Sequence, residues 1–158
     1  MHQSLMANRA SALSMGVSPR PAQTPAMQPS FTVRVECPPG ACTCQRELLL
    51  SQPGADQRIL MLTREEEKKL LERLERISSL NDLEQMLLRI EQQLGVAIVV
   101  APGSNEVRTM RGIHIEMPDM PGLCRKTRQS IPAAIRKGLE RQPEIAWALL
   151  DAHDLFGM

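Results

Sequence analysis

Aromatic side chains are almost absent from this sequence of 158 residues, because two phenylalanines, one tryptophan and no tyrosine make up only 2% of it. Proteins that bind nucleic acids by base stacking use several exposed aromatic residues, so the composition disfavours that class. No apolar run approaches the roughly 18 residues that a membrane-spanning helix needs. The formal net charge of +1 excludes a wholly basic nucleic-acid coat and a wholly acidic solvating chain. We therefore expect an aliphatic core and no membrane partner.

Recognisable catalytic motifs are also lacking. The sequence contains no G-x-S-x-G, P-loop, H-E-x-x-H or G-x-G-x-x-G pattern. Two histidines are conceivable acid–base groups, His114 in an expected strand and His153 between Asp151 and Asp154, but no nucleophile accompanies either. The lack of these motifs weighs against an enzyme without excluding one, and we assign no catalytic residue.

The first thirty residues differ in composition from the rest. Residues 1–30 are rich in Ser, Ala, Gln, Pro and Met and contain no acidic residue. Such a segment cannot bury enough apolar surface to offset the entropy of ordering, so it is interpreted as a disordered tail or as a start assigned too far upstream, with residues 1–26 outside the true protein. It has no continuous apolar segment of the kind found in secretory signals. We expect a cytoplasmic protein with one domain, residues 31–158.

Hydrophobic periodicity predicts an α+β fold for that domain. A small, mostly antiparallel sheet of four to five strands with about four helices is expected after the disordered tail. Capping patterns place helix starts at Thr63 with Glu66, at Asn81 with Glu84, and at Ser130, while Gly95 suits a helix end. The predicted strands are 31–36, 58–62, 96–100 and one or two within 106–117, and the predicted helices are a short one at 45–50, an αα-hairpin over 63–95, one starting at 130 and one at 144–155.

The cysteine placement is the feature with the most chemical content. Cys37, Cys42 and Cys44 lie within eight residues on a loop bent by Pro and Gly, and Cys124 follows far downstream. In a reducing compartment clustered cysteines more often indicate metal or redox chemistry than disulfides. If the 118–124 loop folds over, the four thiolates form a closed site of the kind that structural zinc occupies. We expect zinc ahead of an iron–sulfur cluster.

Three other interpretations of these cysteines stay open. The string Cys37-Pro38-Pro39-Gly40-Ala41-Cys42-Thr43-Cys44 resembles the cluster loop of plant-type [2Fe–2S] ferredoxins, which has C-x4-C-x2-C with a glycine shortly before the second cysteine. It departs from that loop because Cys42 and Cys44 are one residue too close and the fourth cysteine is eighty positions further on. A redox-active thiol pair or buried cysteines that act as small hydrophobes are the remaining alternatives.

Basic residues gather in the segment 108–141, which has eight basic and three acidic residues. Such a surface could contact a nucleic-acid backbone, although a solvated helix face is the commoner meaning of such a run. A helix-turn-helix is disfavoured, since Pro143 separates the last two helices and the last one carries acids without bases. The candidate nucleic-acid-binding residues are Arg125, Lys126, Arg128, Arg136, Lys137 and Arg141.

The leading hypothesis from the sequence is a small accessory protein that is not an enzyme. It would have a cysteine-ligated structural metal and a basic surface for nucleic acid. The alternatives are a metal-free protein–protein interaction module, with a partner or a homodimer contact through 63–95, and an iron–sulfur or thiol redox protein.

Overall fold

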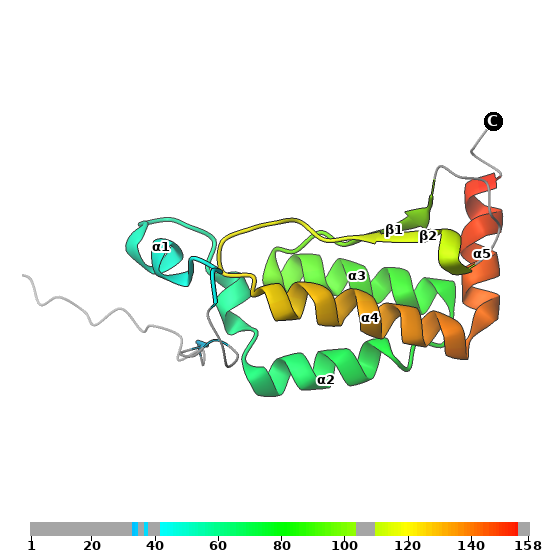
Figure 1. Cartoon of the computed structure of the whole chain (residues 1–158), viewed down its shortest axis with the longest axis horizontal. Helices are drawn as coiled ribbons and strands as arrows, with labels where there is room; N and C mark the ends of the chain where they lie inside the picture. The colour runs from blue at the N-terminus through cyan, green and yellow to red at the C-terminus, as the bar shows by residue number, and fades with distance from the viewer. Residues whose placement is uncertain (1–32, 35–36, 38–41, 104–109, 155–158) are drawn as a thin grey trace, which may run out of the picture. The chain divides into compact units, whose positions relative to one another are not determined.

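The computed structural model describes residues 33–34, 37, 42–103 and 110–154, and over these ranges the fold is mostly helical (Figure 1). Five α-helices, two short 3₁₀ helices and two β-strands follow one another along these residues. In chain order they are α1 (Arg46–Ser51), η1 (Arg58–Met61), α2 (Arg64–Leu74), α3 (Leu80–Leu94), β1 (Val99–Pro102), η2 (Met110–Gly112), β2 (Ile113–Glu116), α4 (Arg125–Arg141) and α5 (Pro143–Asp154). None of these helices is long and apolar enough to cross a membrane.

The predicted α+β class with a sheet of four to five strands is wrong. The two strands form one antiparallel pair, with Val99 opposite Glu116 and Pro102 opposite Ile113. The apolar run expected as a strand at 58–62 forms η1 instead, because a short apolar run has no period that separates a strand from a turn of helix. The strand expected at 31–36 lies mostly outside the described residues, as do residues 104–109 and the predicted tail, 1–30.

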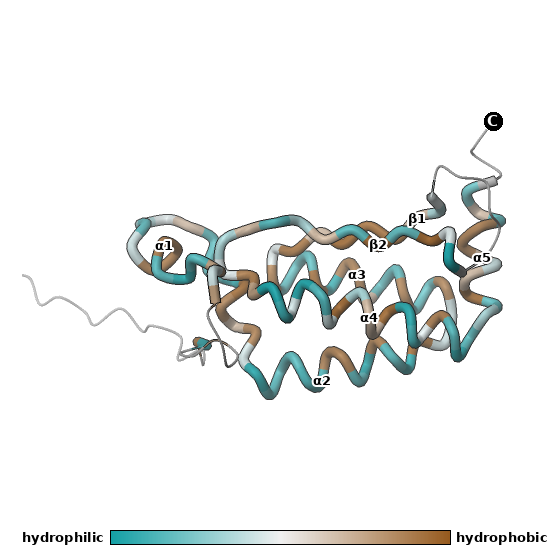
Figure 2. Tube along the Cα trace, viewed as in Figure 1, coloured by the Kyte–Doolittle hydropathy of each residue, from teal (hydrophilic) through white to brown (hydrophobic). Residues whose placement is uncertain are grey.

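The helices are amphipathic and enclose an aliphatic core. Brown and teal segments alternate along α2, α3 and α4 in Figure 2, as expected for helices with one buried face. Helix α4 packs against α2 and α5, α3 packs against η1 and α5, and α5 also contacts β1. The core consists of Leu, Ile, Val, Met and Ala side chains, with Ile59, Leu60, Leu74 and Ile135 completely buried.

Helix boundaries confirm some of the predicted caps and correct others. The Thr63 hydroxyl accepts a hydrogen bond from the Glu66 N–H, and Gly95 ends α3 with a φ of 71°. The start of α3 is two residues earlier than predicted, because Ser79, not Asn81, caps the helix by accepting from the Asp82 N–H. These ends are decided by hydrogen bonds between neighbouring residues, so most of them follow from local patterns.

Helix α4 begins at Arg125 and not at the predicted Ser130. The Ser130 hydroxyl donates to the Lys126 carbonyl oxygen at 2.8 Å and caps nothing. Pro132 therefore lies inside the helix, where it removes one backbone hydrogen bond. The buried stripe that includes Thr127 and Ile131 continues through this point, and its contacts with the core offset the cost of the proline. As a consequence, Cys124 lies directly at the helix start.

Candidate metal centre

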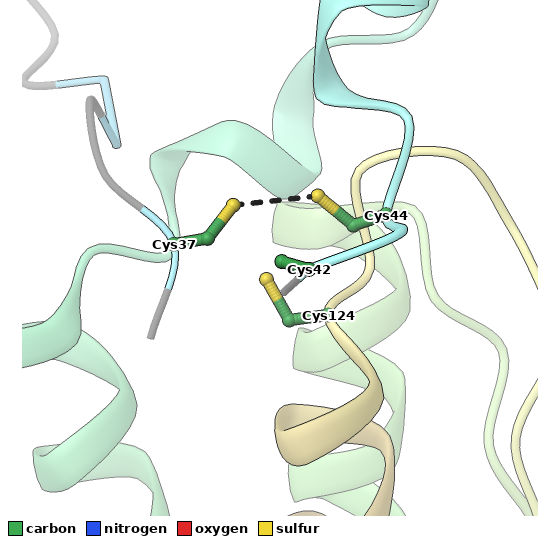
Figure 3. Close-up of side chains that lie close together, drawn as sticks. All are labelled: Cys37, Cys42, Cys44 and Cys124. Carbon is green, nitrogen blue, oxygen red and sulfur yellow. Dashed lines mark hydrogen bonds between the residues drawn. The ribbon is translucent and has the colours of Figure 1, made fainter. Parts of the chain in front are cut away.

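The four cysteine side chains converge on one point (Figure 3). All four Sγ atoms lie within 4.8 Å of one another, and the Sγ atoms of Cys37 and Cys44 are 3.5 Å apart. All four are free thiols: Cys44 and Cys124 are buried, Cys37 is half-buried and Cys42 is exposed. The predicted convergence of Cys124 on the other three is therefore present in the structure. Four sulfur atoms at this spacing are compatible with a cysteine-ligated metal ion.

Cys124 reaches the other cysteines through a turn at Gly122. Gly122 has a φ of 86°, a left-handed conformation that side chains disfavour. Its N–H donates to the carbonyl oxygen of Cys44, which ties the segment before α4 to the segment before α1. A β-carbon at this position would lie 2.6 Å from Leu49 and 2.7 Å from Ile59, so the turn is also pressed against the core. The backbone around Gly122 thus brings together cysteines that are eighty residues apart in the sequence.

A buried arginine lies beside the cysteines. Only 8% of the Arg34 surface is exposed, and its backbone N–H donates to the Leu60 carbonyl oxygen. One guanidinium nitrogen, Nη2, donates to the carbonyl oxygen of Gly122 and lies 4.0 Å from the Cys44 Sγ. The Arg34 Nε has no hydrogen-bond partner, and no carboxylate of the described residues forms an ion pair with this side chain. A buried cation without an anion is costly, because charge is expensive to remove from water.

Burial holds two of the thiols in their neutral form. It raises the pKa of Cys124 strongly, against the opposing attraction of the Arg34 charge. Burial is also the main cause of the raised pKa of Cys37, with a further contribution from the hydrogen bond to Cys44. At Cys42 burial acts in the same direction, but hydrogen bonds from the backbone and side chain of Cys44 outweigh it and lower the pKa. A metal ion that binds here must therefore displace thiol protons, which makes binding dependent on pH.

The amino-terminal end of α4 lies at the cysteine cluster. Cys124 is the N-cap residue, the position at which Ser, Thr, Asp or Asn normally accepts from the first turn, and it makes no side-chain cap hydrogen bond. The first turn contains Arg125 and Lys126 and no acidic residue. Positive side chains at the positive end of a helix dipole are unfavourable unless an anion lies nearby. The local charge pattern therefore favours negative charge on the sulfur atoms.

The six predicted nucleic-acid-binding residues all belong to α4, but they differ in their surroundings. Three are already in ion pairs: Arg128 with Asp119 at 2.7 Å, Lys137 with Glu75 at 3.2 Å, and Arg141 with Glu75 at 3.9 Å. No ion pair within the described ranges engages the other three, which are Arg125, Lys126 and Arg136. All three are exposed.

A polar cavity of about 320 Å³ lies next to the cysteine cluster. Its lining includes Thr43, Cys44, Arg125 and Arg128, so it joins the loop before α1 to the first turns of α4. Asp119 also lines the cavity and pairs with Arg128, so Arg125 is the cation there that forms no ion pair among the described residues. The cavity connects the candidate metal centre to the basic side of α4.

The two histidines take no part in this site. His114 is exposed on β2 and His153 is exposed near the end of α5. The cysteines are the one group of three or more candidate ligands that lie together among the described residues.

Arg34 is the site residue that the sequence analysis missed. Arg34 lies in the alternating string FTVRVE, three residues before the first cysteine. A polar residue in such a strand pattern is normally interpreted as facing solvent, so the pattern gave no sign of its burial.

No protein-family model, curated protein or solved structure matches this chain.

Proposed function

We propose that Cys37, Cys42, Cys44 and Cys124 bind one zinc ion in a closed structural site. The observation that carries this proposal is that all four Sγ atoms lie within 4.8 Å of one another. Zinc–sulfur bonds of about 2.3 Å in a tetrahedron place the sulfur atoms about 3.8 Å apart. The 3.5 Å between Cys37 and Cys44 is close to that spacing, so modest movements of the side chains are enough to complete the site.

The same spacing supports one ion rather than an iron–sulfur cluster. In a cluster, cysteines on different iron atoms are separated by the cluster itself and lie further apart than ligands of a single ion. Four sulfur atoms within 4.8 Å would have to spread to admit a cluster. The short Cys42-Thr43-Cys44 spacing makes that movement harder at one corner.

The charges around the site also support a thiolate centre. Four thiolates and one divalent ion leave two negative charges. Arg34 is buried against the site with no carboxylate partner among the described residues, and the bound centre would supply its missing anion. The first turn of α4, with Arg125 and Lys126, would gain the same compensation. Zinc would then join the chain before α1 to the start of α4, which is a structural role.

The test is metal content, together with the visible absorption of untagged protein purified without oxygen. We expect about one zinc per chain and no colour. Cys42→Ser is the sharpest variant, because Cys42 is exposed and its change leaves the core intact. It should lower zinc affinity at least about tenfold and lower thermal stability only when zinc is present. Thr43→Ala, at the exposed neighbouring position, is the matched control and should retain zinc.

The other outcomes identify the alternatives directly. A brown protein with iron and sulfide would overturn the zinc proposal in favour of an iron–sulfur protein. A reversible thiol titration without metal would favour a redox-active thiol pair. If the protein binds no metal at micromolar concentrations and Cys42→Ser is as stable as the wild type, the metal proposal fails, and a metal-free interaction module becomes the leading function.

We further propose that exposed basic residues of α4 contact a nucleic-acid backbone. The observation in favour is that Arg125, Lys126 and Arg136 are exposed and carry no ion pair within the described residues. Arg125 also lines the polar cavity beside Cys44, where its guanidinium group could meet a phosphate group. The zinc site would hold the first turn of α4 in place for this contact.

Salt dependence tests this second proposal. Three phosphate contacts predict a slope of about −2.7 for log affinity against log salt, so affinity for duplex DNA should fall about 40-fold between 50 and 200 mM salt. Replacing Arg125, Lys126 and Arg136 together by Gln should remove most of that slope. Lys137→Gln with Arg141→Gln is the control, because both side chains already pair with Glu75. No measurable affinity at low salt, or an equal effect of both sets of changes, would reject the proposal.

A further inference from the structure

An apolar groove lies between α2 and α3 and is closed at one end by η1. Its volume is about 880 Å³, at the upper end of the range seen for ligand pockets. Apolar side chains from all three elements form its floor, namely Met61, Leu70, Met86, Ile90 and Leu94. The groove exists because α2 packs mainly against α4, whereas α3 packs against η1 and α5, so the two helices of this hairpin do not close on each other.

The rim of the groove is basic. Four cations, Arg58, Lys69, Arg73 and Arg89, line it together with one acid, Glu66. Three of the cations are held in exposed ion pairs, and Arg89 is in none of the pairs formed by the described residues. Arg58 and Arg73 each make at least two hydrogen bonds to their carboxylate partners, so Arg89 is the cation of the rim that is left for a new carboxylate. The groove therefore fits a segment with an apolar anchor and acidic flanks.

Helix α5 carries those features on its exposed face. Trp147 is 60% exposed, the largest fraction among the exposed large apolar side chains of the described residues. Glu144 and Asp151 are exposed three positions before it and four positions after it, so all three lie along one stripe of the helix. The helix contains no lysine or arginine. A tryptophan between two carboxylates is complementary to an apolar floor with a cationic rim.

We infer that α5 of a second copy of this chain docks in the groove between α2 and α3, with Trp147 on the apolar floor and Asp151 beside Arg89. Within one chain α5 packs against β1, α3 and α4, with Trp147 exposed rather than in the groove. A reciprocal dimer, in which each copy supplies one helix and one groove, satisfies both contacts in a closed assembly. This contact uses none of the cysteines and is independent of the metal proposal.

The single tryptophan of the chain makes the test specific. For the full chain we expect a sedimentation coefficient that rises between about 1 and 200 µM, with a blue shift of Trp147 emission over the same range. Trp147→Ala should weaken self-association at least about 30-fold, the loss typical of a tryptophan hot spot. Leu88→Ala is the matched control, because Leu88 is 53% exposed on α3 but does not line the groove, and it should associate like the wild type.

A charge exchange identifies the contact itself. Arg89→Glu and Asp151→Arg should each weaken self-association when alone, because each places like charges opposite one another. An equimolar mixture of the two variants should recover association, since both contacts of the mixed dimer are again between opposite charges. A sedimentation coefficient independent of concentration, an unchanged Trp147→Ala variant, or a mixture that fails to recover would each overturn the inference. Adding a chelator should change none of these results.

Discussion

Replacing Gly122 by alanine tests how the core holds the cysteine cluster together. Gly122 has a φ of 86°, and a residue with a β-carbon costs about 1–2 kcal/mol in that conformation. The new β-carbon would also lie 2.6 Å from Leu49 and 2.7 Å from Ile59, two buried side chains. Overpacking of this kind costs about 1–3 kcal/mol. We therefore expect Gly122→Ala to lower the free energy of unfolding by about 2–5 kcal/mol.

Gly54→Ala separates the two contributions. Gly54 has nearly the same φ, 81°, but no atom lies within 4 Å of a β-carbon built there. This variant should lose only the backbone cost of about 1–2 kcal/mol. The difference between the two variants, measured by urea unfolding, then reports the contact with Leu49 and Ile59.

The same pair of variants tests the link between the turn and the metal. Gly122 hydrogen-bonds to the backbone of Cys44 and accepts from Arg34, so a displaced turn should move Cys124 away from its three partners. Zinc affinity, measured by competition with a chelator, should fall about tenfold or more in Gly122→Ala and stay unchanged in Gly54→Ala. Equal losses of stability in both variants would refute the argument that the turn is pressed against the core.

Three further predictions concern the helices. Gly138→Ala should lower the melting temperature, because a β-carbon there would lie 2.6 Å from the Leu74 carbonyl oxygen. Alanine by itself favours the helix by about 1 kcal/mol over glycine, so a higher melting temperature would disprove the close crossing of α2 and α4. Ile135→Ala should cost about 2–5 kcal/mol in urea unfolding, since the side chain is fully buried, against less than about 0.5 for exposed Leu88→Ala. The Arg73 guanidinium, together with the Ser78 N–H, lowers the pKa of Asp82. The ionised Asp82 carboxylate therefore stabilises the fold fully above the ordinary carboxyl pKa, and this stabilisation is lost as pH falls through the lowered pKa. Asp82→Asn should therefore cost about 1 kcal/mol at pH 7 and nothing in strong acid, and a cost independent of pH would contradict this.

Local physical chemistry made several features of this protein readable from the sequence. Thr63 caps α2 and Gly95 ends α3, because each depends on hydrogen bonds or backbone angles within a few residues. Pro143 separates α4 from α5 as predicted, although it is itself the first residue of α5. The near absence of aromatic residues predicted an aliphatic core. The grouping of Cys37, Cys42 and Cys44 was likewise visible, since their separation along the chain is shorter than a single loop.

Tertiary contacts decided the rest. The apolar side chains of the run at 58–62 could be buried in a strand or in a helical turn. Packing against the surrounding helices selects the 3₁₀ helix η1. Helix α4 starts five residues before Ser130, and its buried stripe begins at Thr127, ahead of Ser130 and Pro132. The arrival of Cys124 depends on the Gly122 turn, and the burial of Arg34 depends on carbonyl groups of Leu60 and Gly122. Contacts between residues so far apart in the chain produce no local sequence pattern. Residue types and spacing therefore identified the four cysteines, whereas the fold brought them together and placed the buried Arg34 beside them.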